Sequence, residues 1–166
     1  MGAESLTIRR AIDVENVGLD DAPDGVDGDA HADGLEYVLT VLRDNDLPVA
    51  DVRSRPEAFH VAFHGTDSVG VGGVEVHGKD GLLRSVAVEP GVRGEGFGTA
   101  LCDALERRAA EDGVETLYLL TTTAAGFFAG RGYVETDRRA VPTAILGTTE
   151  FRELCPDSAI CMRKTI

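Results

Sequence analysis

The stretch from residue 88 to residue 101 reads VEPGVRGEGFGTAL, and its glycines decide how the rest of the chain is interpreted. They are Gly91, Gly94, Gly96 and Gly98. Each glycine raises the entropic cost of folding, so such a run indicates a turn, a close packing contact or a ligand held by backbone amides. The apolar residues before the run predict a strand. Phe97, Leu101 and Leu105 then predict one face of a helix.

A loop that joins a strand to the start of a helix presents backbone amides, and the helix dipole adds about half a positive charge there. Arg93 adds a full charge in front of the glycines. The stretch therefore predicts a phosphate or pyrophosphate site. It fails the dinucleotide pattern, because Thr99 stands where the last glycine belongs, and it lacks the Gly-Lys-Ser/Thr of a Walker loop. Glycines that only turn the chain are the alternative.

Composition limits the classes of protein to consider. The 166 residues fit one domain, and the net charge of −13 disfavours nucleic-acid binding. An acidic chain with only two lysines fits a halophilic source. No apolar run is long enough to cross a membrane, and the first residues lack a signal-peptide core, so a cytoplasmic location is expected. The three cysteines, without a CxxC pair, favour a reducing compartment. A thiolate site at Cys155 and Cys161 stays an alternative to two buried thiols.

The remaining pattern predicts an α+β domain in which one parallel crossover joins an otherwise antiparallel sheet. Residues 13–34 are acidic and glycine-rich and are interpreted as a solvated loop, with an interaction tail as the alternative. Residues 142–154 form a helical or irregular excursion. The expected strands are 5–12, 58–65, 68–78, 82–90, 114–122, 133–137 and 159–166, and the expected helices are 34–48, 97–112 and 124–132.

The order RGEGFG, between a strand and a helix, resembles the coenzyme A loop of the GNAT-type N-acetyltransferases. The meander before it and the GRGY after the short helix fit the same family. LLRSVAV, LYLLTTTAAGFF, FRELCP and AICM resemble its arsenic-resistance branch, whose relatives acetylate the amino group of arsinothricin and phosphinothricin. The resemblance implies one GNAT domain over 1–166, with a mixed, mostly antiparallel central sheet. It also implies a V-shaped splay between the fourth and fifth strands, and helices on both faces.

The resemblance further implies acetyl-CoA as co-substrate and no metal. The pantetheine arm should run along one strand edge, whose amide near Val86 polarises the acetyl carbonyl. The residues implied for the strand edge are Val86, Ala87 and Val88. Those implied for the pyrophosphate amides are Arg93, Gly94, Gly96, Gly98 and Thr99. Phe128 completes the cofactor-binding set.

One departure from the family concerns proton transfer. Phe128 stands where many members carry the tyrosine that protonates the leaving thiolate. Tyr133, water, or a hydroxyl of Thr121, Thr122 or Thr123 are the alternatives, and Thr122 is taken as the catalytic hydroxyl. Glu75 is the expected general base, and an outward, solvated Glu75 is the competing interpretation. His60, His64 and His77 are expected to be surface or packing residues.

Arg84 lies in an apolar run and needs a partner, because an unpaired buried charge is costly. An oxyanion of an amino-acid-like acceptor would suit its planar guanidinium, and a salt bridge to Glu75 or another acid is the alternative. Arg138 and Arg139 could add an anion contact, although surface charge is favoured for both. The predicted function is direct acetyl transfer to a small amine, with no nucleic-acid or membrane partner. A non-catalytic acyl-CoA-binding or sensor module is the alternative, and a homodimer stays open.

Overall fold

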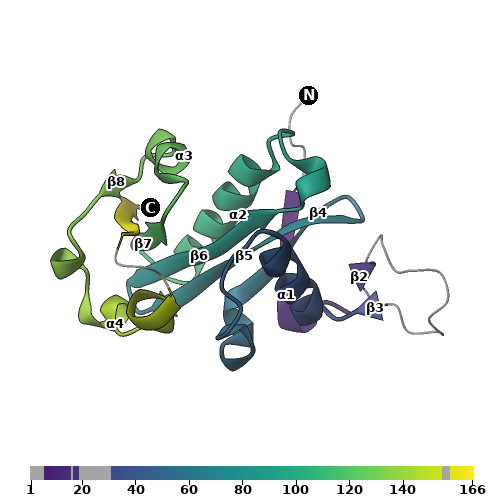
Figure 1. The fold of residues 1–166 in the computed structure, drawn as a ribbon, viewed down its shortest axis with the longest axis horizontal. Coiled ribbons are helices and arrows are strands. Elements are labelled where there is room, and N and C mark those ends of the chain that lie inside the picture. Colours follow the sequence, from purple (N-terminus) through teal and green to yellow (C-terminus); the bar gives the residue numbers. More distant parts are fainter. Residues whose placement is uncertain (1–5, 16, 19–30, 155–157) are drawn as a thin grey trace. The chain divides into compact units, whose positions relative to one another are not determined.

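The computed structural model describes residues 6–15, 17–18, 31–154 and 158–166 (Figure 1). Most of the predicted acidic loop 13–34, and Cys155, therefore lie outside the described residues. Within this part of the chain, seven strands join in one sheet in the order β1-β4-β5-β6-β7-β9-β8. They are β1 (Leu6–Arg10), β4 (Phe59–His64), β5 (Asp67–His77), β6 (Asp80–Val88), β7 (Thr116–Thr121), β8 (Val134–Glu135) and β9 (Ile160–Thr165). The two short strands β2 (Val17–Gly18) and β3 (His31–Ala32) pair separately.

The helices fall close to the predicted ranges. They are α1 (Gly34–Asp44), α2 (Phe97–Glu111), α3 (Ala125–Gly130) and α4 (Thr143–Leu146). Short 3-10 turns occupy Ala11–Asp13, Val52–Ser54, Pro56–Ala58, Pro90–Val92 and Arg138–Ala140, and a π-helical segment covers Glu150–Leu154. The predicted excursion 142–154 is thus helical in two pieces. Helix α1 ends at Asp44, ahead of the expected stop at Pro48, because the chain turns at Asp46, which has a φ of 57°.

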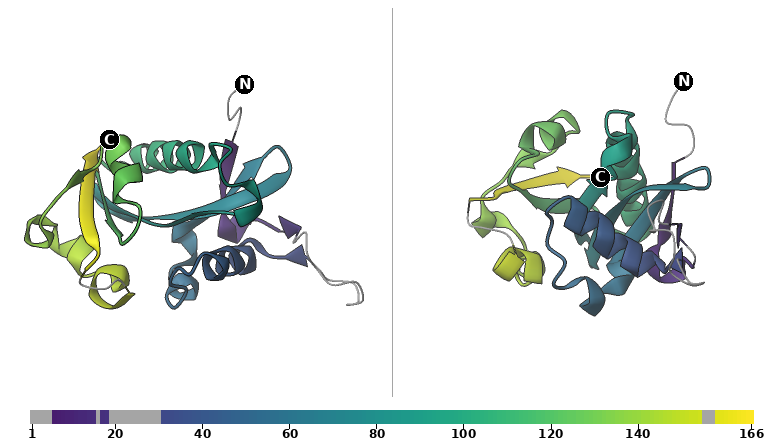
Figure 2. Two further views of the ribbon diagram at one scale, coloured as in Figure 1. Left: turned by 45° about the horizontal axis from the view of Figure 1, so that its top comes forward. Right: turned by 45° about the vertical axis from the view of Figure 1, so that its right-hand side comes forward.

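The chain forms two compact units, and strands β5 and β6 pass through both. The first unit contains residues up to Gly73 and Ser85–Leu105. In it, β1 pairs antiparallel with β4, and β4 pairs antiparallel with β5. Figure 2 shows α1 and α2 on opposite faces of these strands. Apolar side chains of α1 pack on one face, against a core that includes Phe59, Val61, Val71 and Ala87.

Helix α2 packs on the opposite face of the first unit, and it comes close to β5 because a glycine lies at the point of contact. Leu101 and Leu105 of α2 are buried. A Cβ atom on Gly72 of β5 would lie 2.4 Å from a methyl carbon of Leu105. Because side chains alternate between the two faces of a strand, Val71 turns toward α1 and position 72 turns toward α2. The glycine therefore sets how closely the helix approaches the sheet.

The second unit contains Val74–Arg84 and Glu106–Ile166. In it, β6 runs parallel to β7 over three pairs, from Asp80–Thr116 to Leu82–Tyr118. Strand β7 continues to Thr121 and pairs antiparallel with β9 along its whole length. Leu117, Tyr118 and Leu119 are all buried, as predicted for a strand covered on both faces. One parallel pair in an otherwise antiparallel arrangement confirms the predicted α+β order.

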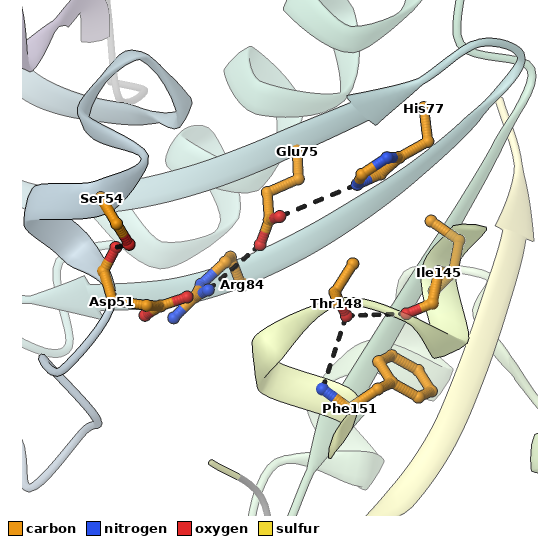
Figure 3. Close-up of polar contacts among 8 residues, drawn as sticks. All are labelled: Asp51, Ser54, Glu75, His77, Arg84, Ile145, Thr148 and Phe151. Atoms are coloured by element: carbon orange, nitrogen blue, oxygen red, sulfur yellow. Dashed lines mark hydrogen bonds and ion pairs between the residues drawn. The ribbon is translucent and has the colours of Figure 1, made fainter. Parts of the chain in front are cut away.

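A separate apolar core stabilises the second unit, where α4 and the π-helical segment pack on the sheet. Leu82, Tyr118, Ile145, Phe151 and Cys161 form it, together with Val141. Thr148 closes the turn between the two helical pieces: its hydroxyl donates to the Ile145 carbonyl (2.7 Å) and accepts from the Phe151 amide (3.4 Å) (Figure 3). The splay predicted between β6 and β7 involves residues of both units and stays a prediction, as does the single domain.

Candidate functional site

The glycine loop predicted to bind an anion lies wholly in the first unit. Gly94 and Gly96 have φ values of +83° and +85°, in the left-handed region that side chains disfavour. A Cβ atom at either position would meet no atom within 4 Å. Their role is therefore to set the backbone conformation and not to relieve packing. The space beside this backbone is open to a ligand.

Helix α2 begins directly after these glycines. Its first i to i−4 hydrogen bond joins the Ala100 amide to the Gly96 carbonyl (3.2 Å). The amides of Phe97, Gly98 and Thr99 precede that bond and lie at the positive end of the helix dipole. The exposed Arg93 lies just ahead of the loop, and its guanidinium donates to Asn45 Oδ1. This set of amides with one cation is suited to a phosphate-bearing ligand.

The strand segment before the loop is held against β5. The Glu89 amide donates to the Val69 carbonyl (2.9 Å). A Cβ atom on Gly70 would lie 2.5 Å from the Ala87 carbonyl oxygen, so the two strands approach closely there. Ser85 has a φ of 56°, which is rare for a residue with a side chain and marks a local break in the strand. The break falls immediately before the predicted pantetheine edge, residues 86–88.

The second unit contains a buried ionic group that Figure 3 shows in close-up. Glu75 and Arg84 are each 3% exposed, and Arg84 Nη1 donates to Glu75 Oε2 at 3.1 Å. The other carboxylate oxygen, Oε1, lies 3.7 Å from Nε2 of His77, two residues along β5. An outward, solvated Glu75 is therefore wrong, and the alternative of a salt bridge between Arg84 and Glu75 is confirmed. Mutual neutralisation explains how both charges are tolerated in the interior.

The aromatic residues around α3 also belong to the second unit. The ring of Phe128 packs edge-on against Phe127 (5.1 Å) and Tyr133 (5.4 Å). Tyr133, one of the alternative proton donors, is 2% exposed and packs in the core. Thr121 is engaged at the start of α3, where its hydroxyl accepts from the Ala124 amide (2.9 Å). Thr122 is exposed.

The remaining candidate side chains are distributed as follows. His60 is buried, and His64 is exposed with its ring 5.2 Å from that of Phe97. Arg139 lies at the surface, as favoured, whereas Arg138 donates to the Ala159 carbonyl (3.1 Å). Burial raises the pKa of the Cys161 thiol, and the nearby Arg138 partly opposes this rise.

The described residues contain neither a candidate metal cluster nor a candidate membrane span. In the described ranges no cluster of three or more His, Cys, Asp or Glu residues is placed to hold a metal ion. No helix within the same ranges is both long and apolar enough to cross a membrane. The thiolate site proposed at Cys155 and Cys161 stays a prediction, because Cys155 lies outside the described residues.

Comparison with known proteins addresses the family. Residues 55–135 match the model of the acetyltransferase (GNAT) domain. The structure superposes on that of N-acetylglutamate synthase from Neisseria gonorrhoeae, which is complexed with coenzyme A and N-acetyl-glutamate. The TM-score is 0.71 and the sequence identity is 15%. The superposition covers 97% of this chain and 35% of the synthase chain. The fold is the GNAT fold. The match to the acetyltransferase (GNAT) domain model covers just under half of the chain.

Two further proteins resemble this chain. Rv2747 of Mycobacterium tuberculosis, in complex with CoA and a second ligand, superposes with a TM-score of 0.66 and 22% identity, over 80% of this chain and 93% of that one. An amino-acid acetyltransferase of Pseudomonas putida is 38% identical over 64 residues, which are 39% of this chain and 15% of that protein. The chain thus spans a small part of the curated relatives it matches.

The predicted site residues divide between the two units. The loop residues and the strand edge 86–88 lie together in the first unit, whereas Glu75, Arg84, Thr122 and Phe128 lie in the second. Sequence reasoning missed two residues that contact the loop segment: Tyr37 of α1 and Asn45, the residue that caps the C-terminus of α1. The Asp-Asn-Asp run after the apolar stripe of α1 signals a helix end, but nothing local identifies Arg93 as the partner of Asn45.

Proposed function

We propose that this protein is an acetyl-CoA-dependent N-acetyltransferase that transfers acetyl directly to a small amine in a ternary complex. The observation that carries the proposal is the loop 93–99, in which left-handed glycines and the first amides of α2 form an open anion site beside Arg93. The GNAT fold supports coenzyme A as the anion. The CoA-bound GNAT structures that the chain resembles support the same donor.

The proposed donor site uses residues of the first unit. The amides of Arg93, Gly94, Gly96, Gly98 and Thr99 would bind the pyrophosphate. The edge formed by Val86, Ala87 and Val88 would bind the pantetheine arm, and an amide near Val86 would stabilise the oxyanion that develops on the acetyl carbonyl. These donors suit the ligand, because the backbone amides donate hydrogen bonds to phosphate oxygens and the arginine adds one positive charge.

The proposed chemistry forms one C–N bond and breaks one C–S bond. The neutral amine attacks the thioester carbon, the amine loses a proton, and the departing thiolate gains one. We assign proton removal to Glu75, through Oε1, the oxygen that lies 3.7 Å from Nε2 of His77, directly or through water. We assign the hydroxyl near the leaving thiolate to Thr122, because Phe128 has no proton to give.

The proposed acceptor is amino-acid-like and carries an oxyanion, as in the arsenic- or phosphorus-containing amino acids that the sequence resemblance implies. Arg84 is the proposed contact for that oxyanion. Its planar guanidinium can donate two parallel hydrogen bonds to an oxyanion, which is the geometry that such an acceptor requires. The Pseudomonas relatives named as amino-acid acetyltransferases support an amino-acid acceptor.

A thiol-release assay with acetyl-CoA and a panel of amino acids, including glutamate analogues, tests the function in molar salt. Turnover is the expected result. CoA binding without turnover across the panel would instead favour a non-catalytic acyl-CoA-binding or sensor module, which the missing tyrosine hydroxyl at Phe128 favours. The salt optimum of the same assay tests the halophilic, cytoplasmic setting inferred from the net charge of −13. Sedimentation of the active species tests the homodimer.

A further inference from the structure

The C-terminus of α1 has a well-defined geometry close to the glycine loop in the first unit. The Leu47 amide donates to the Leu42 carbonyl (2.9 Å), and the Asp46 amide donates to the Arg43 carbonyl (3.1 Å). These two bonds, with Asp46 in the left-handed region, form a Schellman motif. Leu42 and Leu47 pack in the same apolar core. The position of Asn45, between these bonds, is therefore fixed by backbone and core together.

The side chain of Asn45 is oriented as well as placed. Its amide nitrogen donates to the Val41 carbonyl (2.8 Å), which turns the amide oxygen away from the helix. That oxygen accepts a hydrogen bond from Nη2 of Arg93. The partial negative charge at a helix C-terminus favours the same cation. Because the guanidinium has five N–H donors, Arg93 keeps donors for a phosphate while it is held by Asn45.

A second contact joins α1 to the other end of the same segment. The hydroxyl of Tyr37, a buried residue of α1, donates to Oε1 of Glu89. Glu89 lies at the end of β6, and the turn Pro90–Val92 separates it from Arg93. Helix α1 and its C-cap residue Asn45 thus contact both residues that bound the turn leading into the glycine loop.

We infer that Asn45 is a positioning residue for the donor, which acts by holding Arg93 in place for the pyrophosphate of coenzyme A. This inference rests on the proposed function. An exposed arginine loses rotamer freedom when it binds a ligand, and an immobilised long side chain costs about two- to twelvefold in affinity. Asn45 supplies that order in advance. The gain applies only to ligands that carry the pyrophosphate.

Calorimetric titration of the full chain with CoA and with pantetheine, which lacks the pyrophosphate, tests the inference. Asn45→Ala is expected to weaken CoA binding by about three- to tenfold and to leave pantetheine binding unchanged. Asp44→Ala, at the exposed neighbouring position, is the matched control and should bind both ligands as the wild type does. In an Arg93→Ala background, Asn45→Ala should have no further effect, because the residue acts through Arg93.

Three results would overturn the inference and leave the function standing: wild-type CoA affinity in Asn45→Ala, equal weakening of both ligands, or additive effects in the double variant. Failure of the wild-type chain to bind CoA would overturn the proposed function and the inference with it.

If Asn45→Ala does not fold, Tyr37→Phe tests the anchoring by α1 with the loss of one oxygen atom. It should weaken CoA binding by about two- to fivefold, and unchanged affinity would overturn the anchoring.

Discussion

Replacing Glu106 with glutamine should destabilise the fold far more than an exposed substitution on the same helix. Glu106 lies in the part of α2 that belongs to the second unit, and its side chain is 11% exposed. One carboxylate oxygen accepts from Arg131, after α3, and the other from Lys164 of β9. Lys164 Nζ also lies 5.5 Å from the centre of the Tyr133 ring. The buried carboxylate of Glu106 thus links α2 to the segment after α3 and to β9.

The magnitude follows from what the substitution leaves behind. Removing one partner of a buried ion pair costs about 3–5 kcal/mol, because the remaining charge is not compensated. Here two cations remain, and the 24% exposure of Lys164 lets water reach one of them, so we expect about 3 kcal/mol. For a chain of this size that loss lowers the Tm by about 6–12 °C.

Chemical denaturation of Glu106→Gln measures the loss, with Glu111→Gln as the control, since Glu111 is exposed at the end of the same helix. The control should stay within about 0.5 kcal/mol of the wild type. Lys164→Met added to Glu106→Gln should recover part of the stability by removing one of the two cations. The difference between the two single variants should persist in 2 M KCl, because buried pairs are poorly screened. Equal stability of the two single variants would refute the assignment.

Gly96→Glu should weaken CoA binding at least tenfold without unfolding the chain, because it places a charge and a strained φ in the anion loop. The control is Gly91→Glu, because a Cβ atom at Gly91 also meets no atom within 4 Å but the residue lies outside the proposed pyrophosphate site. This variant should bind CoA more tightly than Gly96→Glu, and equal affinities would contradict the loop assignment. Arg84→Lys should raise the acceptor KM at least tenfold and change that of acetyl-CoA less than twofold, since lysine lacks the planar fork. Arg139→Lys, 94% exposed at its side chain, is the control, and the opposite KM pattern would remove Arg84 from the acceptor site. Burial raises the pKa of Cys161, so the unfolded thiol ionises first and stability should fall as the pH rises above about 9. The slope of the free energy of unfolding against pH should be smaller in Cys161→Ala, and an unchanged slope would contradict this.

The glycine loop was predictable because its determinants are local. A strand, a run of glycines, an arginine and an amphipathic helix follow one another within residues 81–112. Each has a backbone signature that needs no distant partner. The left-handed φ of Gly94 and Gly96 is the conformation for which glycine is preferred. The order of the other elements was equally accessible, since hydrophobic periodicity distinguishes strands from helices.

The environment of Glu75 shows where this local information ends. Alternation along β5 places Glu75 and His77 on the same face of the strand, and the sequence contains that much. Whether the face meets water or a partner depends on the strand beside it and on what covers both. The apolar run around Arg84 was the useful signal, because a cation in such a run requires a buried anion. Glu75 was one of several acids that could have supplied it.

Contacts between distant residues were out of reach for the same reason. Asn45 and Arg93 are 48 positions apart, Glu106 and Arg131 are 25 apart, and Glu106 and Lys164 are 58 apart. No propensity or motif links such pairs. The composition gains meaning from the structure. The chain has only two lysines, and one of them, Lys164, pairs with the buried Glu106. In a protein with 16 basic and 29 acidic residues, the basic side chains in buried ion pairs are those whose removal should cost the most stability. Because basic residues are few, Arg93 is a main source of positive charge for the pyrophosphate of the proposed acetyl-CoA donor. The orientation of Arg93 by Asn45 is therefore the contact to test first.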